Sequence, residues 1–540
     1  MNRKFMVIVA LVLVLSLTLT GCAGVDFAGY FAQLGQLLLG GTVTAFANME
    51  YTRPDMEKLQ TVVDDCCGRV SQAENLDALV ELILDAYEPL DAFSTAYALA
   101  NIHYSRDLTD TYWAEEYAFC SENAAIAQAA LDRLYRELAK SPFRAELEGD
   151  DYFGTAFFDD YMGESFYDDA FTGLLAEEAA LESEYFALWS EAGGMDPHSE
   201  EFLKNYGQQM EELYVELVAV RQKMAAHLGY GSYPEFAYDY YYDRDYTCEQ
   251  TTAYLADIRA ELAPLYRQMV TNGVDAQMDL CDEASTLAYV RQMASSMGGT
   301  MKEAFDTMQK NGLYDISYSD KKANTSFEIY ISSYYTPFIF LDPTGYEQDK
   351  LTFAHEFGHF CCDYASYGSG AGVDVAEVFS QGMEYLSLTY VKDVGDLDVI
   401  KMVDSLSTFV EQAAYASFEQ QVYSLTEEEL TAENIRQLFG QVGTAYGFDS
   451  WGFDSRSYVM VSHFFTSPMY VIGYVVSNDV ALQIYEMELT QRGSGLACLE
   501  NNLTTRHSGI VAFAEAAGLE SPFAAGRMTR IKEILRTVLE

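Results

Sequence analysis

Residues 355–359 read HEFGH, and this stretch constrains the chain more than any other. Apolar residues flank it on both sides, which suits a buried helix. On a helix, positions i and i+4 share a face, so His355 and His359 can both reach one zinc ion. Glu356 beside them can take a proton from zinc-bound water. The chain has only 7 His in 540 residues, so a chance match is rare. The alternative is a helix with two hydrogen-bonded histidines and no metal.

A catalytic zinc needs a third protein ligand and keeps one position for water. A glycine-rich turn at residues 368–372 lets the chain double back, and the sequence DVAEVFSQGMEYL after it suits a second helix. Glu377, eighteen residues after His359, is the predicted third ligand. Glu384, one heptad further on the same face, is the competing ligand, although we expect it to orient a ligand histidine instead. Asp374 either supports a ligand or is a solvated carboxylate at the helix start.

A peptide-cleaving zinc site also needs donors for the oxyanion of its tetrahedral intermediate. Three candidates, His463, Tyr470 and Tyr474, are polar groups in an apolar stretch that contains Gly and Pro, residues 462–474. Taken alone this signal is weak, because the chain has 41 Tyr. Tyrosines among Val and Ile are otherwise core residues with a solvated hydroxyl.

These blocks resemble, in the same order, the thimet oligopeptidase and oligoendopeptidase F family of zinc metallopeptidases. HEFGH followed by DVAEVFSQGMEYL is similar to that family's zinc helix and the helix that carries its glutamate ligand. SHFFTSPMYVIGYVVSNDVALQIYE resembles its C-terminal His/Tyr block and is closer to the oligoendopeptidase F branch. Residues 338–345 resemble the strand and turn before the zinc helix, and residues 227–233 and 244–247 resemble the entry to the catalytic half. The resemblance covers about residues 200–540, and the N-terminal helical region more faintly.

The resemblance implies one zinc per chain on His355, His359 and Glu377, with Glu356 as the general base. It implies substrate or oxyanion roles for His463, Tyr470 and Tyr474. It also implies oligopeptide substrates, because the channel of such folds excludes folded proteins. The sequence departs from the family at Cys362, where relatives often carry another histidine. This puts in doubt any supporting role assigned to that position.

The N-terminus predicts an exported lipoprotein. Arg3 and Lys4 precede a nearly apolar segment, residues 6–19, which has the length of a signal segment and is short for a membrane span. The sequence LTGC that ends at Cys22 resembles a bacterial lipoprotein cleavage box. We expect a mature chain anchored by acyl chains on Cys22 at the extracytoplasmic face of a bacterial membrane. The alternative is an ordinary signal peptide.

Residues 27–49 also lack charge but are rich in Gly and Gln. They predict a membrane-proximal amphipathic helix and tether, with a second membrane span as the alternative. The net charge of −51 argues against nucleic-acid binding, which needs a basic surface. The acidity either favours cationic peptides or only keeps the protein soluble. None of the 9 Cys forms a metal-like C-x-x-C pair. Cys361 and Cys362 are expected to be buried thiols, while disulfide pairing and oligomeric state stay open.

We predict a mainly α fold, with two helical lobes around a deep substrate cleft and a small β-sheet next to the HExxH helix. Residues 78–86 and 124–138 have helical apolar spacing, and alternation over residues 326–341 predicts the sheet, which an extended peptide could join. Thr247 and Gln250 predict a capping box that opens a helix towards Leu265. The tyrosine-rich run at residues 238–243 lines a substrate channel or forms a solvated loop with partly buried rings.

The predicted domains are a signal peptide at residues 1–21, a tether at 22–50, an N-terminal helical region at 51–245 and a catalytic region at 246–540. The leading function is a zinc metalloendopeptidase that cleaves oligopeptides. One alternative is an aminopeptidase of the same zinc class, against which the missing Gly-x-Met-x-Asn motif weighs. The other is a lipoprotein that binds peptides without cutting them, which an intact Glu356 disfavours.

Overall fold

The computed structural model describes residues 43–149, 153, 157–163, 165, 167–193, 195–273, 279–368, 371–505 and 509–536. The predicted signal peptide, Cys22 and residues 22–42 of the predicted tether lie outside the described residues. Within the described ranges, no helix is both long enough and apolar enough to cross a membrane.

Packing divides the chain into two compact units, and neither is continuous in sequence. The first holds residues 1–179, 299–342 and 360–370, and the second holds 180–298, 343–359 and 371–540. These units do not follow the predicted boundary at residue 245. Sequence resemblance and packing need not divide a chain at the same residue, so the predicted domain bounds stay predictions.

The first unit is built on three long amphipathic helices. Their apolar faces share one core that includes Leu59, Ile83 and Leu134, all at most 1% exposed. Asp55, Asn75 and Asp110 cap these helices with side chains that accept backbone N–H groups, the usual role of such residues at helix starts. The helices of this unit are η1 (Phe46–Asn48), α3 (Met56–Val70), α4 (Leu76–Arg106), α5 (Thr111–Ala139), α6 (Arg144–Leu147), η2 (Phe157–Tyr161), α14 (Gly299–Asn311) and η5 (Ser332–Tyr334).

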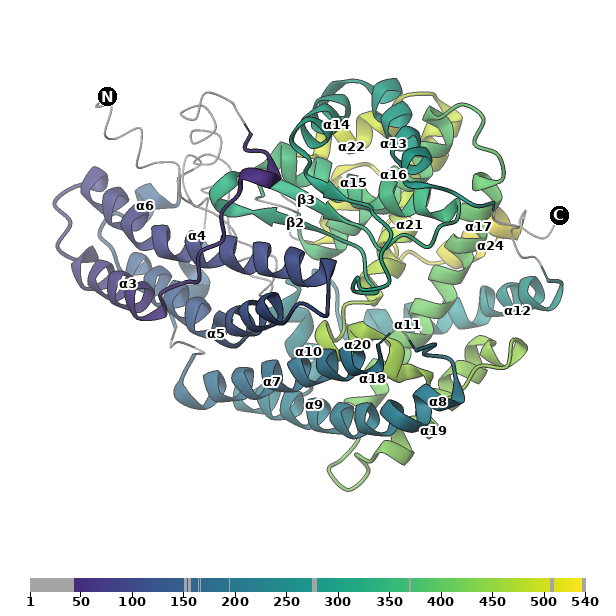
Figure 1. Ribbon diagram of the computed structural model, residues 1–540, viewed down its shortest axis with the longest axis horizontal. Helices are drawn as coiled ribbons and strands as arrows, with labels where there is room; N and C mark the ends of the chain where they lie inside the picture. The colour runs from purple at the N-terminus through teal and green to yellow at the C-terminus, as the bar shows by residue number, and fades with distance from the viewer. Residues whose placement is uncertain are drawn as a thin grey trace. The chain divides into compact units, whose positions relative to one another are not determined.

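A three-stranded sheet completes the first unit, in the order β1 (Tyr314–Asp315), β3 (Thr336–Phe340), β2 (Phe327–Ile331). β2 and β3 form an antiparallel hairpin in which Phe327 pairs with Phe340, and β1 adds to β3 in parallel. α4 packs on β2 (Figure 1). The hairpin was predicted from the alternating pattern, whereas β1 is too short to leave a periodic signal.

Residues 43–50, the described end of the predicted tether, pack on the first unit. Phe46 is buried, its ring centroid 4.3 Å from that of Phe338, and Arg106 lies over the same ring. The backbone N–H of Glu50 donates to the hydroxyl of Tyr334 at 2.8 Å. The folded part of the chain therefore begins before residue 51.

Among its described residues, the second unit has helices as its regular elements, apart from an isolated bridge between Leu280 and Tyr346. Its helices are α8 (Glu200–Phe202), η3 (Leu203–Gly207), α9 (Gln208–His227), α10 (Tyr233–Phe236), η4 (Ala237–Tyr241), α11 (Cys248–Glu261), α12 (Ala263–Thr271), α13 (Glu283–Met297), α16 (Val373–Tyr390), α17 (Leu397–Ser407), η6 (Thr408–Gln412), α18 (Ala413–Val422), α19 (Ala432–Tyr446), η7 (Phe448–Ser450), η8 (Ser457–Met460), α20 (Ser462–Thr466), α21 (Ile472–Thr490), α22 (Ser494–Asn502), α23 (Ile510–Ala516) and α24 (Arg527–Leu535). α7 (Asp169–Ala192) and α15 (Gln348–Ser366) contribute residues to both units.

The mainly helical prediction with a small sheet before the HExxH helix is confirmed. Residues 78–86 lie in α4, residues 124–138 lie in α5, and the Thr247–Gln250 capping box opens α11 as predicted. The helix predicted to run on to Leu265 is wrong in its length. α11 ends at Glu261, and Pro264 stands in the first turn of α12, where its missing N–H does no harm. The substrate cleft stays a prediction.

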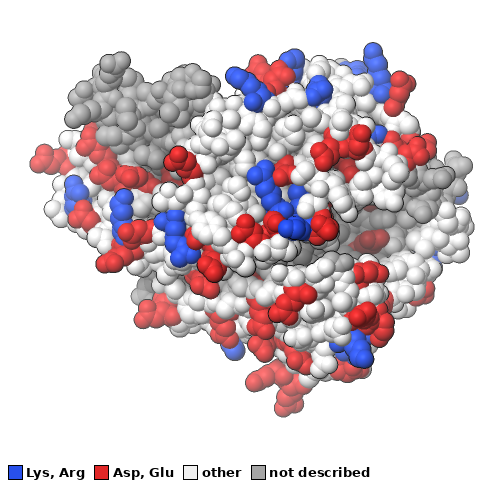
Figure 2. All heavy atoms as spheres, viewed as in Figure 1, with Lys and Arg blue, Asp and Glu red and all other residues white. Residues whose placement is uncertain are grey.

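Acidic side chains are spread over much of the face seen in Figure 2, with fewer basic ones among them. This agrees with 83 Asp and Glu against 32 Lys and Arg in the sequence.

Candidate metal centre

A tight turn fixes the start of α15. The carboxylate of Asp349 accepts the backbone N–H groups of Thr344 and Gly345 at 2.9 and 2.8 Å and the Thr344 hydroxyl at 2.7 Å. Gly345 has a φ of +83°, a conformation that only glycine adopts without strain. This is the segment that resembles the family's strand and turn, and it aims the helix that carries His355 and His359.

α15 and α16 touch backbone to backbone at Gly358. A Cβ at this position would lie 2.6 Å from the carbonyl oxygen of Phe379 and 2.6 Å from the Cα of Ser380. α16 is buried almost all round, packed along α21. The glycine in HEFGH therefore lets the two helices approach closely enough for their polar groups to meet.

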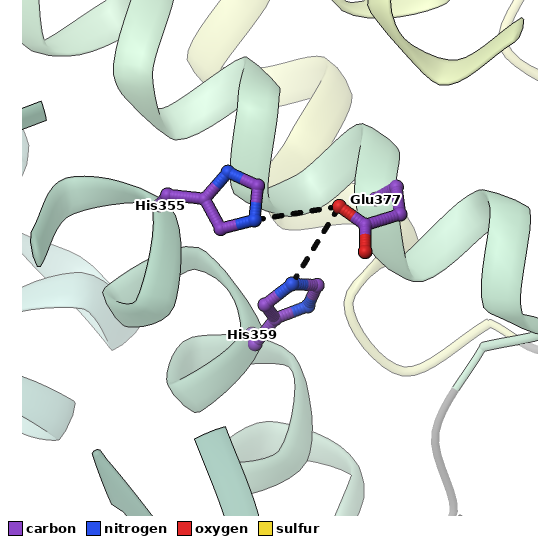
Figure 3. A group of neighbouring side chains, drawn as sticks. All are labelled: His355, His359 and Glu377. Atoms are coloured by element: carbon purple, nitrogen blue, oxygen red, sulfur yellow. Dashed lines mark ion pairs between the residues drawn. The ribbon is translucent and has the colours of Figure 1, made fainter. Parts of the chain in front are cut away.

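The contact brings His355, His359 and Glu377 together, as predicted, and places all three in the second unit. One ligand atom of each lies within 4.8 Å of the others. Nε2 of His355 and Nε2 of His359 are 3.4 and 3.8 Å from Oε2 of Glu377. Figure 3 shows the two imidazoles projecting from α15 towards the carboxylate on α16. Glu356 lies between the two histidines in α15 and is 5% exposed.

Burial and neighbouring charges set the protonation of this cluster. Burial lowers the pKa of His359 to about 4, which leaves its ring nitrogen free to act as a ligand. Burial alone would raise the pKa of Glu377, but His359, His355 and a hydrogen bond from Tyr470 outweigh it and lower that pKa to about 2. Burial opposes a charge on His355, yet Glu377 and Glu384 together raise its pKa.

Two of the three candidate ligands, His355 and Glu377, are held by further groups. Nδ1 of His355 donates to Oε1 of Glu384 at 2.7 Å, so the preference for Glu384 as the orienting group matches the geometry. The hydroxyl of Ser380 donates to Oε2 of Glu377 at 3.0 Å, and the hydroxyl of Tyr470 donates to Oε1 at 2.5 Å. Such outer contacts fix the orientation of metal ligands.

His463, Tyr470 and Tyr474 lie together beside the cluster. Nε2 of His463 is 3.1 Å from the Tyr474 hydroxyl, and the rings of Tyr470 and Tyr474 are 5.2 Å apart. Burial and Glu377 raise the pKa of both tyrosines well above the ordinary value, so both hydroxyls stay protonated donors. Burial lowers the pKa of His463, which favours a neutral ring. The two tyrosines differ in that only Tyr470 contacts a candidate ligand directly.

The turn that presents Tyr470 is held from several sides. Arg244, 1% exposed, donates to the carbonyl of Met469 at 2.8 Å and to that of Tyr470 at 3.4 Å. Tyr242 donates to the carbonyl of Pro468 at 2.7 Å. Glu419 accepts the N–H of Met469 at 2.6 Å, and Met469 itself has a φ of +65°. This turn is therefore fixed in a conformation that a non-glycine residue rarely adopts.

Asp374 is not the solvated carboxylate that was one of the two predictions for it, and it contacts Arg244 and Tyr246 rather than a candidate ligand. It is 5% exposed, Arg244 contacts both of its oxygens at 3.1 and 3.2 Å, and the Tyr246 hydroxyl donates to it at 2.6 Å. A Cβ at Gly473 would lie 2.6 Å from the same carboxylate, so glycine there makes room for it. Asp374 thus ties Arg244 to the start of α16, and it is not solvated.

Sequence reasoning missed Arg244 and Lys401 as supports of the site. Arg244 follows the tyrosine-rich run and lies over the rings of Tyr238 and Tyr242. Most of that run is helical, in η4, and not a loop, while its place in a substrate channel stays a prediction. Lys401 donates to Glu384 from α17 and lies outside every motif. Cys361 and Cys362 are buried thiols, as predicted, and no disulfide occurs among the described residues.

The donor set fits zinc. Two imidazole nitrogens and one carboxylate oxygen are the three protein ligands of a common class of catalytic zinc site. The hydrogen bond from Nδ1 of His355 to Glu384 leaves Nε2 turned towards the other two donors, as a metal-binding histidine requires.

Residues 46–162 match the family model described as Peptidase M3 N-terminal domain. No curated protein is similar enough in sequence to be matched. Among solved structures, an oligoendopeptidase F shares 22% identity at a TM-score of 0.82, over 92% of this chain and 98% of its own. PZ peptidase A, solved with an inhibitor, shares 21% at a TM-score of 0.80, over 91% and 98%. An oligoendopeptidase F from Bacillus anthracis shares 22% at a TM-score of 0.78, over 92% and 98%.

Residues 46–162 thus match an M3 peptidase N-terminal domain, and the chain has the fold of the solved oligoendopeptidase F structures. Both findings support the resemblance to the oligoendopeptidase F family that the sequence motifs predicted.

Proposed function

We propose that this protein is a zinc-dependent endopeptidase that hydrolyses oligopeptides. The observation that carries the proposal is the meeting of His355, His359 and Glu377 within 4.8 Å, with Glu356 in the same helical turn. Two histidines that served only for packing would not need the buried carboxylate of Glu377 beside them. They would also not need the carboxylate of Glu384 on the other side of the His355 ring.

A zinc ion held by the three ligands supplies a Lewis acid for the scissile carbonyl and acidifies a water molecule. Glu356 takes the proton from the attacking water and passes it to the leaving amine. The Tyr474 hydroxyl donates to the oxyanion that develops on the former carbonyl oxygen. His463 orients Tyr474 through its 3.1 Å contact, and Tyr470 holds Glu377.

Oligopeptides are the proposed substrates because of the similarity to oligoendopeptidases. The similar solved structures are named as oligoendopeptidases and a peptidase, and the similarity covers 91 to 92% of this chain. We also propose that the mature protein is held at the extracytoplasmic face of a bacterial membrane by a lipid on Cys22. That proposal rests on the LTGC sequence behind an apolar segment.

Cleavage of an internally quenched oligopeptide tests the activity. The native protein should cleave it, lose activity with a chelator and regain it with zinc. Glu356→Gln keeps the size of the side chain but removes the base, so zinc should remain bound while kcat falls by about 10²–10⁴.

An N-acetylated version of the same peptide separates the related functions. An endopeptidase cuts it, whereas an aminopeptidase needs the free amine. A protein that binds this peptide but releases no product with zinc bound would contradict the proposal and support a binding lipoprotein.

A further inference from the structure

Lys401 on α17 is a buried cation next to the metal centre. Its side chain is 2% exposed, and its ammonium lies 4.7 Å from the centre of the Tyr385 ring. It donates to Oε2 of Glu384 at 2.7 Å and to Oδ2 of Asp404 at 3.0 Å. Burying an ammonium is unfavourable unless anionic acceptors compensate for the lost water. The position of this charge is therefore specified by its partners.

Glu384 is held at both oxygens. Oε1 accepts from Nδ1 of His355 at 2.7 Å while Oε2 accepts from Lys401 at 2.7 Å, and the side chain is 9% exposed. Its main chain is fixed too, because Ser387 donates to the Glu384 carbonyl at 2.6 Å and also contacts the Tyr289 hydroxyl at 2.8 Å. The carboxylate cannot turn away from His355 without leaving a buried ammonium short of one acceptor.

This arrangement forms a continuous series of contacts, His355–Glu384–Lys401–Asp404, that begins at a candidate ligand. The carboxylate fixes the ring of His355 with Nδ1–H towards Glu384 and Nε2 towards Glu377. The ligand motif does not predict the contacts of Lys401 and Asp404. Both residues lie in α17, which follows a separate turn, and Lys401 comes seventeen residues after Glu384.

We infer that Lys401 is a positioning residue that sets how tightly the His355–His359–Glu377 cluster holds zinc, by fixing the Glu384 carboxylate against His355. The inference rests on the proposed function, because it assumes that this cluster is the metal site. Removing a group that contacts a metal ligand directly, as Glu384 contacts His355, typically weakens metal binding by about 10–100-fold, and Lys401 acts through that contact.

Lys401→Met tests the inference, because methionine has a similar length but no charge and no donor. The zinc dissociation constant is measured by chelator competition, without peptide, at a temperature well below unfolding. We expect weaker binding, with the loss of about 10–100-fold for a direct partner of a ligand as the upper limit. Asp404→Asn is the matched control, because it changes the other partner of Lys401 and leaves the contact with Glu384 in place; its zinc affinity should stay close to that of the native protein.

Glu384→Gln and the double variant show whether Lys401 acts through Glu384. If it does, Lys401→Met should add little to the effect of Glu384→Gln, since coupled residues are not additive. If the Met variant does not fold, Lys401→Gln takes its place in the same series. Native-like zinc affinity in a folded, less stable Lys401 variant would show a merely structural role and overturn the inference. Additive effects would overturn it as well.

Failure of the inference and failure of the proposed function give different results. If the native protein binds no zinc at this cluster, the proposed function fails. If the native protein binds zinc tightly and the Lys401 variants bind it equally well, the inference about Lys401 fails and the proposed function stands.

Discussion

At the scale of single residues, the two tyrosines of the C-terminal block differ in their partners. The Tyr474 hydroxyl contacts His463, whereas the Tyr470 hydroxyl contacts Glu377. Tyr474→Phe should therefore lower kcat by about 10²–10³, as expected for an oxyanion donor, with little change in KM. The measurement is steady-state cleavage of an oligopeptide by zinc-loaded enzyme.

Tyr470→Phe is the matched control for this change. It removes a hydrogen bond to the candidate ligand Glu377. In chelator competition, the Tyr470→Phe protein should therefore lose zinc more readily than the Tyr474→Phe protein. His463→Ala should lower kcat. It should also raise KM if His463 holds the substrate backbone. Full activity in all three variants would mean that these side chains are ordinary core residues.

We expect Glu419 to make the stability of the fold depend on pH. Burial raises its pKa from 4.5 to about 8, although the N–H of Met469, Arg221 and Arg244 oppose the shift. The pKa of Glu419 is higher in the folded state than in the unfolded state. Its contribution to the free energy of unfolding is therefore full below about pH 4.5 and is lost as the pH rises through 8. Stability should fall by up to about 1.4 kcal/mol per pH unit in that window.

Urea unfolding between pH 5 and pH 8 measures this dependence in the native protein and in Glu419→Gln. The glutamine keeps an acceptor for the N–H of Met469 but does not titrate, so its stability should change less with pH. Equal pH dependence in the two proteins would show that Glu419 is not the group responsible.

At the scale of helices, the crossing of α15 and α16 depends on Gly358. A methyl group there would meet backbone atoms of α16 at 2.6 Å, so Gly358→Ala must push the helices apart or distort one of them. We expect a loss of zinc affinity together with a stability loss of about 1–3 kcal/mol, typical of overpacking.

Gly68→Ala is the control, because a Cβ at that exposed position in α3 meets nothing within 4 Å. It should stabilise the protein by roughly 0.5–1 kcal/mol, since alanine is the better helix former. Thermal unfolding and chelator competition on both variants make the comparison. Unchanged zinc affinity in Gly358→Ala would contradict the role given to this crossing.

The parts of the site that could be predicted from the sequence are those set within one helix or one turn. His355, Glu356 and His359 follow from helical spacing, and Glu377 follows from a turn between two helices. Arg244 and Lys401 could not be predicted in the same way, because tertiary packing brings each of them to its partner. The end of α11 has a local signal in Pro264, which favours a new helix start over continuation of α11.

At the scale of the whole molecule, the proposed anchor depends on Cys22. A Cys22→Ser protein should carry no acyl group and should leave the membrane fraction, because a single thiol is the attachment point. Intact mass and fractionation of cells that produce each protein provide the test. An unlipidated protein that stays in the membrane fraction would point to residues 27–49 as the anchor instead.

The central claim is that His355, His359 and Glu377 bind one zinc ion, and the zinc content of purified protein tests it most directly. The native protein should contain one zinc per chain. Glu377→Ala should lose most of it, whereas Glu384→Ala should keep it when zinc is in excess, because that residue only orients His355. A native protein without bound zinc, or a Glu377→Ala protein that keeps a full zinc while Glu384→Ala loses it, would contradict the account.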